Sequence, residues 1–452
     1  MTIPRWFTEQ RRIELKTFAA RSRQVVLAAA AVGALTGLFV AGFERVVVTG
    51  AFDHVLEAPL WAIAVLPMFG LLASFLLRRF VGGGVSSASA DEYLRSFHEP
   101  DHSLGLRGAV ARTLAAVATL GAGGPMGLEG PSLYGGATIG YHLQRRFPRV
   151  FRDADRRVLL VAGAGAGVAA IFKAPATGAV FALEVPYHDD LARSMLLPAL
   201  VSSACSYLVF VAINGTSPLF PVSGTLGLSY RDLIGAAVLG AVAGLGARAF
   251  AWMLRRAKAI GASDRPALAA IAAGLVIAAL FVIGRGLTGE SLIVGPGYEV
   301  LSWATDPGRS IGILLAVLVL RCLATSATVA GGGVGGLFIP LVVAGALSGA
   351  AVGGAVHRGD LTLFIVVGVA AFLGAGYRVP LAAVMFVAET TGRPSFIVPG
   401  LIAAVAAELM MGSSSVTDYQ RTTALAAADI GSPEASPGRP DPASPPSTGE
   451  PT

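Results

Sequence analysis

The sequence predicts an all-α membrane protein with several spans, built from two related halves. Of its 452 residues 54% are hydrophobic and only 14% are charged, and the mean hydropathy is +0.68. This composition excludes an ordinary soluble protein. Two glycine-rich stretches, residues 121–140 and 330–340, interrupt the apolar pattern. Interrupted segments at corresponding places in two halves point to the binding site of a transporter.

Apolar segments follow one another along most of the chain, and most are long enough to cross a bilayer. They lie near residues 24–43, 60–77, 109–123, 158–185, 196–213, 234–253, 267–285, 311–330, 337–356, 361–388 and 396–412. Several are short or broken, so we do not expect every segment to cross fully. The two cysteines, Cys205 and Cys322, fall inside apolar runs and indicate neither a disulfide framework nor a metal cluster.

Residues 1–23 are rich in basic side chains mixed with aromatic and aliphatic ones, which predicts an amphipathic helix leading into the first span. No secretory signal is recognisable, so we expect that span to remain in the mature protein. A second basic cluster, Arg255, Arg256, Lys258 and Arg265, lies in a middle loop. The positive-inside rule puts both regions in the cytoplasm. Because both regions flank spans, they do not indicate nucleic-acid binding.

Glu129 is a single carboxylate inside the first glycine-rich stretch. An ionisable group within a membrane segment is costly and marks a functional site by default. Gly130 and Pro131 follow it, which predicts a broken helix that restarts just after Glu129. The unpaired amides and positive dipole of a helix start suit an anion. The alternative is a loop exposed to water between two spans, but the similar stretch 330–340 favours a site.

Two further segments repeat one another. Residues 170–184 and 375–389 each carry an aromatic and a basic residue before X-Pro, then run through small and apolar residues to a glutamate. Pro175 and Pro380 are 205 residues apart, and Pro131 and Pro340 are 209 apart. Two landmarks at nearly one offset indicate an internal duplication, with halves at 24–215 and 216–420. Residues 421–452, rich in Pro, Ser, Ala and Gly, are predicted to be a disordered cytoplasmic tail.

Two other patterns have more than one interpretation. Gly82, Gly83 and Gly84 free the backbone to approach a ligand closely, although on their own they fit a flexible linker better. His98-Glu99-Pro100-Asp101-His102 matches the zinc-protease pattern H-E-x-x-H. Pro100 breaks the helical turn that this pattern needs, so we expect a polar loop and no metal site. A membrane metalloenzyme on His98 and His102 is kept only as an alternative.

Gly127-Leu128-Glu129-Gly130-Pro131 and Gly336-Leu337-Phe338-Ile339-Pro340 look like the G-[K/R]-E-G-P and G-x-F-x-P motifs of the CLC family of chloride channels and chloride/proton antiporters. The chain resembles this family from about residue 25 to 420, in its bacterial type without CBS domains. The resemblance implies two inverted repeats whose broken helices meet at a mid-membrane anion site. It also implies a homodimer in the bacterial plasma membrane, surrounded by lipid, with both termini cytoplasmic and no cofactor.

The resemblance assigns a role to several residues. Glu129 would be the gating carboxylate, and Gly130 and the amides of Leu337 and Phe338 would contact the anion. The family's G-S-G-I-P motif maps to residues 82–86, so Gly83 replaces the anion-contacting serine, leaving Gly83 and Gly84 as backbone contacts. The family's inner-gate tyrosine maps to Thr417, with Tyr419 as the alternative.

Two departures concern protons. The proton-relay glutamate of the antiporters maps to Val185, next to Glu184, so coupling would need water or another group such as Glu184. Lys173 is either a lysine reaching the cytoplasmic surface or a cation of the inner vestibule.

The sequence therefore predicts chloride transport by a CLC-type protein, gated by Glu129, with altered or loose proton coupling and no enzymatic activity. A passive chloride channel is one alternative. An unrelated inverted-repeat solute transporter, which would be indifferent to Glu129→Gln, is another.

Overall fold

The structure is a computed structural model that describes residues 5–99, 101–148, 151, 156–216, 230–356 and 361–422, with side chains from residue 23 onward. The predicted disordered tail, apart from its first two residues, lies outside the described residues. Within them the chain is helical and has no strand beyond two isolated bridges.

The described part of the first half forms nine α-helices. They are α1 (Arg5–Val47), α2 (Asp53–Glu57), α3 (Leu60–Leu76), α4 (Ser89–His98), α5 (Leu106–Gly121), α6 (Glu129–Arg146), α7 (Val158–Phe172), α8 (Pro175–Glu184) and α9 (Leu196–Asn214). Short helical turns at Val48–Phe52, Leu77–Val81 and Arg193–Met195 extend or join them.

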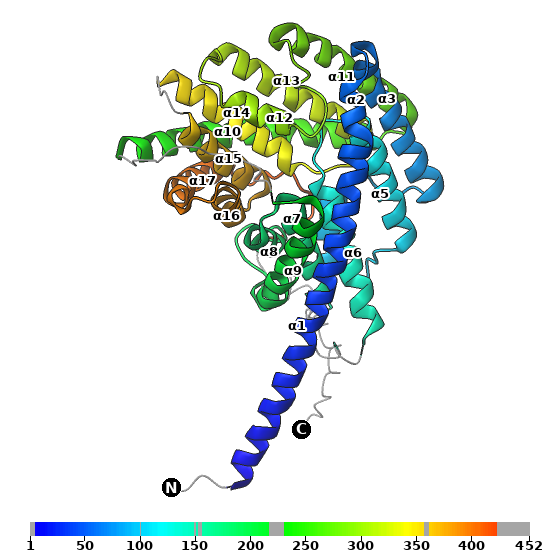
Figure 1. The fold of residues 1–452 in the computed structure, drawn as a ribbon, viewed down its shortest axis with the longest axis vertical. Helices are drawn as coiled ribbons and strands as arrows, with labels where there is room; N and C mark the ends of the chain where they lie inside the picture. The colour runs from blue at the N-terminus through cyan, green and yellow to red at the C-terminus, as the bar shows by residue number, and fades with distance from the viewer. Residues whose placement is uncertain are drawn as a thin grey trace, which may run out of the picture.

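The described part of the second half forms eight more. They are α10 (Tyr230–Gly261), α11 (Pro266–Thr288), α12 (Tyr298–Ala304), α13 (Ile311–Ala330), α14 (Phe338–Ala355), α15 (Thr362–Tyr377), α16 (Pro380–Thr391) and α17 (Ile397–Met411), with one short turn at Pro394–Phe396. In Figure 1 the helices of the first half run from blue to green, and those of the second half run from green through yellow to orange.

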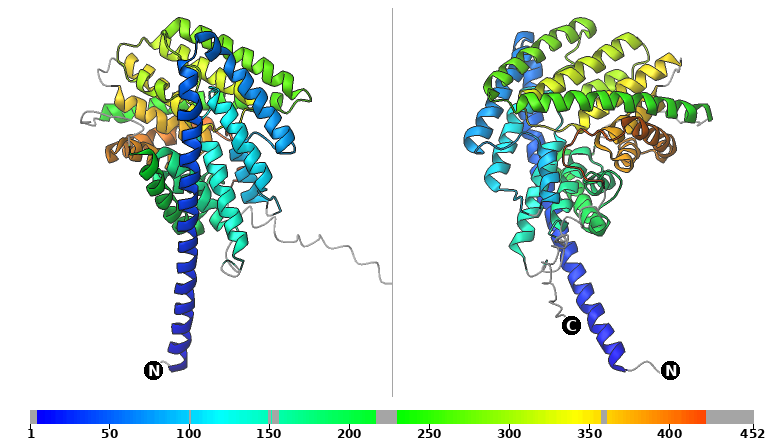
Figure 2. Two further views of the ribbon diagram at one scale, coloured as in Figure 1. Left: turned by 45° about the vertical axis from the view of Figure 1, so that its right-hand side comes forward. Right: turned by 180° about the vertical axis from the view of Figure 1, so that it is seen from behind.

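Eight helical segments among the described residues are long and apolar enough to cross a membrane. The multi-span prediction is therefore confirmed. α1 is one continuous helix of 43 residues, so no break marks the expected boundary between residues 23 and 24. Its N-terminal end projects well beyond the other helices (Figures 1 and 2).

The apolar segments 158–185 and 361–388 are each split into two helices. α7 ends at Phe172 and α15 ends at Tyr377, and the residues that cap them, Lys173 and Arg378, have a left-handed backbone, with φ of 55° and 58°. Ala174 then precedes Pro175, and Val379 precedes Pro380. A residue directly before proline disfavours the helical backbone conformation. The same local chemistry therefore breaks both segments at equivalent points.

Helix packing repeats between the halves. α6 packs on α7 as α14 packs on α15, and α1 packs on α9 as α10 packs on α17. Glycines allow the first pair of contacts: a Cβ on Gly136 would lie 2.1 Å from the Gly163 oxygen, and one on Gly345 would lie 2.4 Å from the Gly368 oxygen. Small residues let membrane helices approach closely. The predicted two-repeat helical fold is confirmed.

Candidate functional site

The two glycine-rich loops lie against each other. Gly127 and Gly336 form an antiparallel bridge: the Gly127 N–H donates to the Gly336 oxygen at 2.9 Å, and the Gly336 N–H donates to the Gly127 oxygen at 2.7 Å. α6 begins at Glu129 and α14 begins at Phe338, just after these loops. The bridge therefore brings the starts of two helices, one from each half, to one place.

The Glu129 carboxylate lies on the first turn of α14. Its Oε1 accepts hydrogen bonds from the amides of Phe338 at 2.6 Å and Ile339 at 3.4 Å. Glu129 is only 4% exposed, and its Oε2 has no hydrogen-bond partner among the described residues. A carboxylate oxygen thus accepts the hydrogen bonds that the amides of a helix start could otherwise donate to an anion.

Glycine is required on both sides of this carboxylate. A Cβ on Gly127 would lie 1.8 Å from Glu129 Oε2, and one on Gly336 would lie 2.1 Å from Oε1. Any side chain at either position would displace the carboxylate or the loop. The glycine pattern that the sequence shows is therefore explained by close packing against Glu129.

Two threonines hold the loops from the opposite half. Thr119 Oγ1 accepts from the Val334 amide at 3.1 Å, and the Thr325 hydroxyl donates to the Pro125 oxygen at 2.8 Å. Each hydroxyl satisfies a backbone group that the irregular loop leaves without a helical partner. The loop conformation is fixed by both halves together.

The Phe338 side chain anchors the start of α14 in an aromatic cluster. Its ring centroid lies 4.3 Å from that of Phe172, 4.9 Å from Phe386, 5.6 Å from Phe181 and 6.4 Å from Tyr377. The rings come from α7, α8, α15 and α16. They hold the Phe338 amide where it meets Glu129.

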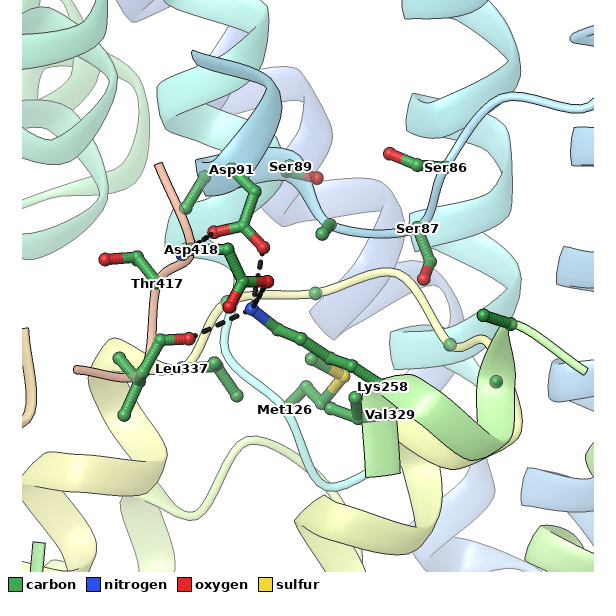
Figure 3. Close-up of a pocket in the computed structure, with 18 of the residues that line it drawn as sticks. Ser86, Ser87, Ser89, Asp91, Met126, Lys258, Val329, Leu337, Thr417 and Asp418 are labelled. Carbon is green, nitrogen blue, oxygen red and sulfur yellow. Dashed lines mark hydrogen bonds and ion pairs between the residues drawn. The ribbon is translucent and has the colours of Figure 1, made fainter. Parts of the chain in front are cut away.

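A cavity of about 270 Å³ lies beside this site (Figure 3). Met126, Gly335, Gly336 and Leu337 of the two loops line it, together with Tyr377 at the end of α15. The remaining charged and hydroxyl side chains of the lining come from the turn after α3, from the start of α4 and the segment before it, from the end of α10 and from the chain after α17: Arg78, Ser86, Ser87, Ser89, Asp91, Lys258, Thr417 and Asp418.

Comparison with known proteins places this geometry in a family. The model of the family described as voltage gated chloride channel matches residues 69–412, more than half of the chain. The chain belongs to this family. We refer to it below as the CLC family.

Its relatives are named as exchange transporters. The chain is 28% identical over 417 residues to an H(+)/Cl(-) exchange transporter ClcA of Citrobacter koseri, with 85% of each chain covered. It is 27% identical over 435 residues to the ClcA of Salmonella typhi, with 89% of each covered.

Two solved structures share the fold. A slow cyanobacterial Cl−/H+ antiporter superimposes with a TM-score of 0.75 at 21% identity, covering 86% of this chain and 94% of that one. A CLC-type fluoride/proton antiporter gives a TM-score of 0.71 at 22% identity, covering 91% and 99%.

The structure brings about half of the residues predicted from the CLC resemblance together. The Phe338 amide meets Glu129 and Leu337 lines the adjoining cavity, but Ile339, which was not predicted, supplies the second amide to Glu129. Gly130 packs against the other loop, where a Cβ would lie 2.7 Å from the Gly335 oxygen.

Thr417 and Tyr419 are separated by the structure. Thr417 lines the cavity, and its hydroxyl lies 3.0 Å from the Ser415 hydroxyl. Tyr419 is 39% exposed and lies outside the cavity lining, with the Arg95 guanidinium 6.0 Å from its ring centre. Of the two alternatives, Thr417 is the one at the cavity.

Gly83 and Gly84 are not brought to the cavity. Both are exposed, with φ of +71° and +91°. Ser86, Ser87 and Ser89 line the cavity in their place, because α4 starts only at Ser89. The expectation that only backbone amides face the anion here therefore does not fit the structure. The polar run Ser86-Ser87-Ala88-Ser89, just before a helix, was the signal that could have found them.

Lys173, Glu184 and Val185 also lie outside the cavity lining. Glu184 accepts hydrogen bonds from the amides of Leu381 and Ala382 at 3.0 and 2.8 Å, at the start of α16. Val185 is buried, and Lys173 is half-buried at the end of α7. The predicted proton-path residues thus lie outside the cavity that adjoins Glu129.

His98 and His102 turn to separate partners. His98 Nε2 lies 2.8 Å from the Pro186 oxygen, and His102 Nε2 lies 2.9 Å from Glu92 Oε2. In the part of the chain that the structure describes, no three His, Cys, Asp or Glu side chains gather as metal ligands.

Several cavity residues were not predicted. Among them, Asp91, Lys258 and Asp418 form an ion-paired group, and Tyr377 adds a buried aromatic side chain. They come from segments far apart in sequence, so no local pattern could have joined them. In the sequence, Lys258 is one of several basic residues in a predicted loop.

Proposed function

We propose that this protein moves chloride or a similar small anion across a membrane, with Glu129 as a protonatable gate. The observation that carries the proposal is the bond from the Phe338 amide to Glu129 Oε1. Amides at a helix start attract an anion without a fixed cation that would trap it. The printed names of the relatives, which are H+/Cl− exchangers, support chloride as the first substrate to test.

The gate follows from competition for the same donors. While Glu129 is ionised, its Oε1 fills the amides of Phe338 and Ile339, so an anion is excluded. A protonated carboxyl is a poorer acceptor for these amides and carries no charge to repel an anion. Proton uptake therefore releases the side chain and lets the anion bind, which links the two fluxes.

We propose that this linkage is loose. Val185 has no ionisable atom, and the Glu184 carboxylate is held by the amides of Leu381 and Ala382. A proton passing through Glu184 would have to disrupt the cap of α16. Water in the cavity is then the main route, and water selects protons less strictly than a fixed relay.

The test is chloride efflux from liposomes, with external pH recorded at the same time, for the wild type, Glu129→Gln and the exposed control Glu57→Gln. We expect chloride to drive proton movement in the wild type and in Glu57→Gln. Glu129→Gln should keep chloride flux and lose proton movement. If Glu129→Gln behaves like the control, Glu129 is not the gate.

A passive chloride channel is the second candidate, favoured by the valine at position 185. It predicts chloride flux in the wild type with no linked proton movement in the same experiment. Absence of chloride flux would turn the test to fluoride and nitrate.

We propose the bacterial plasma membrane as the location, with both termini in the cytoplasm. The support is the basic group of Arg255 and Arg256 near the end of α10 and Arg265 in the α10–α11 loop. α11 has 23 apolar-rich residues, enough for one span, so Ser263 and Glu290 should face opposite sides. In a variant without native cysteines, a cysteine introduced for Ser263 should be protected from an impermeant reagent in whole cells, whereas one introduced for Glu290 should react.

We also propose a homodimer, on the CLC resemblance. α9 and α17 offer exposed apolar side chains to a partner or to lipid, among them Leu197, Leu208, Val405 and Leu409. Cross-linking in native membranes should yield a dimer; a monomer at every concentration would contradict it.

A further inference from the structure

Lys258 joins three separate segments at the cavity. Its ammonium donates to Asp91 Oδ2 of α4 and to Asp418 Oδ2 of the chain after α17, each at 2.7 Å, and to the Val416 oxygen at 3.1 Å. All three of its N–H donors are therefore in use. Figure 3 shows the Lys258 side chain extended across the cavity between the two carboxylates.

The two carboxylates differ in burial. The Asp91 side chain is 9% exposed, and its Oδ1 also accepts from the Asp418 amide at 3.2 Å. The Asp418 side chain is 46% exposed. Asp91 is thus fixed to the lysine, whereas Asp418 is held mainly by the lysine and lies partly in solvent. A partly exposed ion pair of this kind contributes little to stability, so Asp418 is easily displaced.

The group carries one net negative charge, and Leu337 and Gly336 line the same cavity. Gly336 is the residue against which the Glu129 carboxylate packs. The other described charge in the lining is Arg78, whose guanidinium donates to the Val85 oxygen at 3.2 Å. An anion in this cavity therefore lies beside both Lys258 and Asp418, and Asp418 is the more exposed of the two.

We propose that Lys258 is a binding site for the transported anion, at which the anion replaces the Asp418 carboxylate. This inference rests on the proposed function. The exchange has the same form as the one at Glu129: a carboxylate of the protein occupies the positive site until the anion displaces it. Because Asp91 stays bound, the lysine is never left as an unpaired cation. The competing Asp418 keeps the anion's residence short, as conduction requires.

The test is equilibrium exchange of radioactive chloride in liposomes, with equal chloride on both faces so that protein orientation does not matter. Asp418→Asn removes the competitor, so the chloride concentration for half-maximal exchange should fall by about fivefold. Asp264→Asn makes the same change in the exposed α10–α11 loop and should leave it unchanged.

Lys258→Gln alone would leave Asp91 buried and unpaired and is a risk to folding. We therefore use the double variant Asp91→Asn/Lys258→Gln, which removes one charge of each sign and so leaves the net charge of the cavity lining unchanged. Its half-maximal concentration should rise by about fivefold or more. Adding Asp418→Asn to this double variant should then have no further effect.

The possible failures are distinct. If Asp418→Asn matches Asp264→Asn, or still lowers the half-maximal concentration when Lys258 is absent, the Lys258 site is contradicted while the Glu129 gate stands. If the wild type exchanges no anion and Glu129→Gln changes nothing, the proposed function itself fails.

Discussion

Glu184 and Glu389 cap each other's helices. Glu184, the last residue of α8, accepts from the amides of Leu381 and Ala382 in the first turn of α16. Glu389, near the end of α16, accepts from the amides of Ala176 and Thr177 in the first turn of α8, at 2.9 and 2.7 Å. The two repeated segments are therefore joined head to tail at both ends.

We predict that Glu184→Gln and Glu389→Gln each destabilise the protein by about 1–2 kcal/mol, because a neutral amide is a weaker cap than a carboxylate. Thermal unfolding in detergent would show a lower midpoint for both variants and no change for Glu57→Gln. The ratio of protons to chloride should stay at its wild-type value in Glu184→Gln. Loss of proton movement in that variant would instead identify Glu184 as the relay.

Gly336→Ala should abolish most chloride transport. Its Cβ would lie 2.1 Å from Glu129 Oε1 and 2.6 Å from the Gly130 nitrogen, which belongs to the first turn of α6, close to the bridge between Gly127 and Gly336. Gly312→Ala, in α13 with no atom within 4 Å of the new Cβ, is the matched control and should keep wild-type flux. Equal flux from the two variants would show that the loop is less rigid than the bridge implies.

Ser87→Ala should change the chloride-to-nitrate selectivity, because Ser87 lines the cavity and a hydroxyl can donate to one anion better than to another. Gly83→Ala should leave selectivity unchanged, since Gly83 is exposed and outside the cavity lining. It should only lower stability by about 1–2 kcal/mol, the cost of a side chain at positive φ. Competition between chloride and nitrate in liposomes would distinguish Ser87→Ala from Gly83→Ala. A selectivity change in Gly83→Ala but not in Ser87→Ala would show that Gly83 contacts the anion, as the sequence motif predicted.

His98 should make the protein sensitive to acid. α4 is not among the candidate spans, and burial lowers the pKa of His98 from 6.5 to about 4. Because the folded state binds the proton less well than the unfolded state, the stabilisation is complete above pH 6.5 and is lost as the pH falls toward 4. Thermal midpoints from pH 7.5 to 4 should fall less in His98→Gln than in the wild type. The exposed control His54→Gln should follow the wild type.

The sequence could predict Glu129, the two glycine-rich loops and the repeats, because each depends on residues close together in the chain. It also marked Glu184 and Glu389 as equivalent positions, but not their partners, since a helix start 200 residues away cannot be inferred from spacing. Gly83 was misplaced because three glycines matched a motif, whereas the start of α4 at Ser89 decides which residues reach the cavity. The group of Asp91, Lys258 and Asp418 depends on three separate segments and needed the structure.

The bond between Glu129 and Phe338 also has a consequence for synthesis of the protein. The Phe338 amide follows Glu129 by 209 residues. At roughly 5–20 residues per second, the ribosome needs about 10–40 s to supply it. During that time the first half must keep a carboxylate hydrated at the edge of the bilayer, because the donors that receive it have not yet been made. We therefore expect α6 to settle at its final depth only after α14 has been inserted.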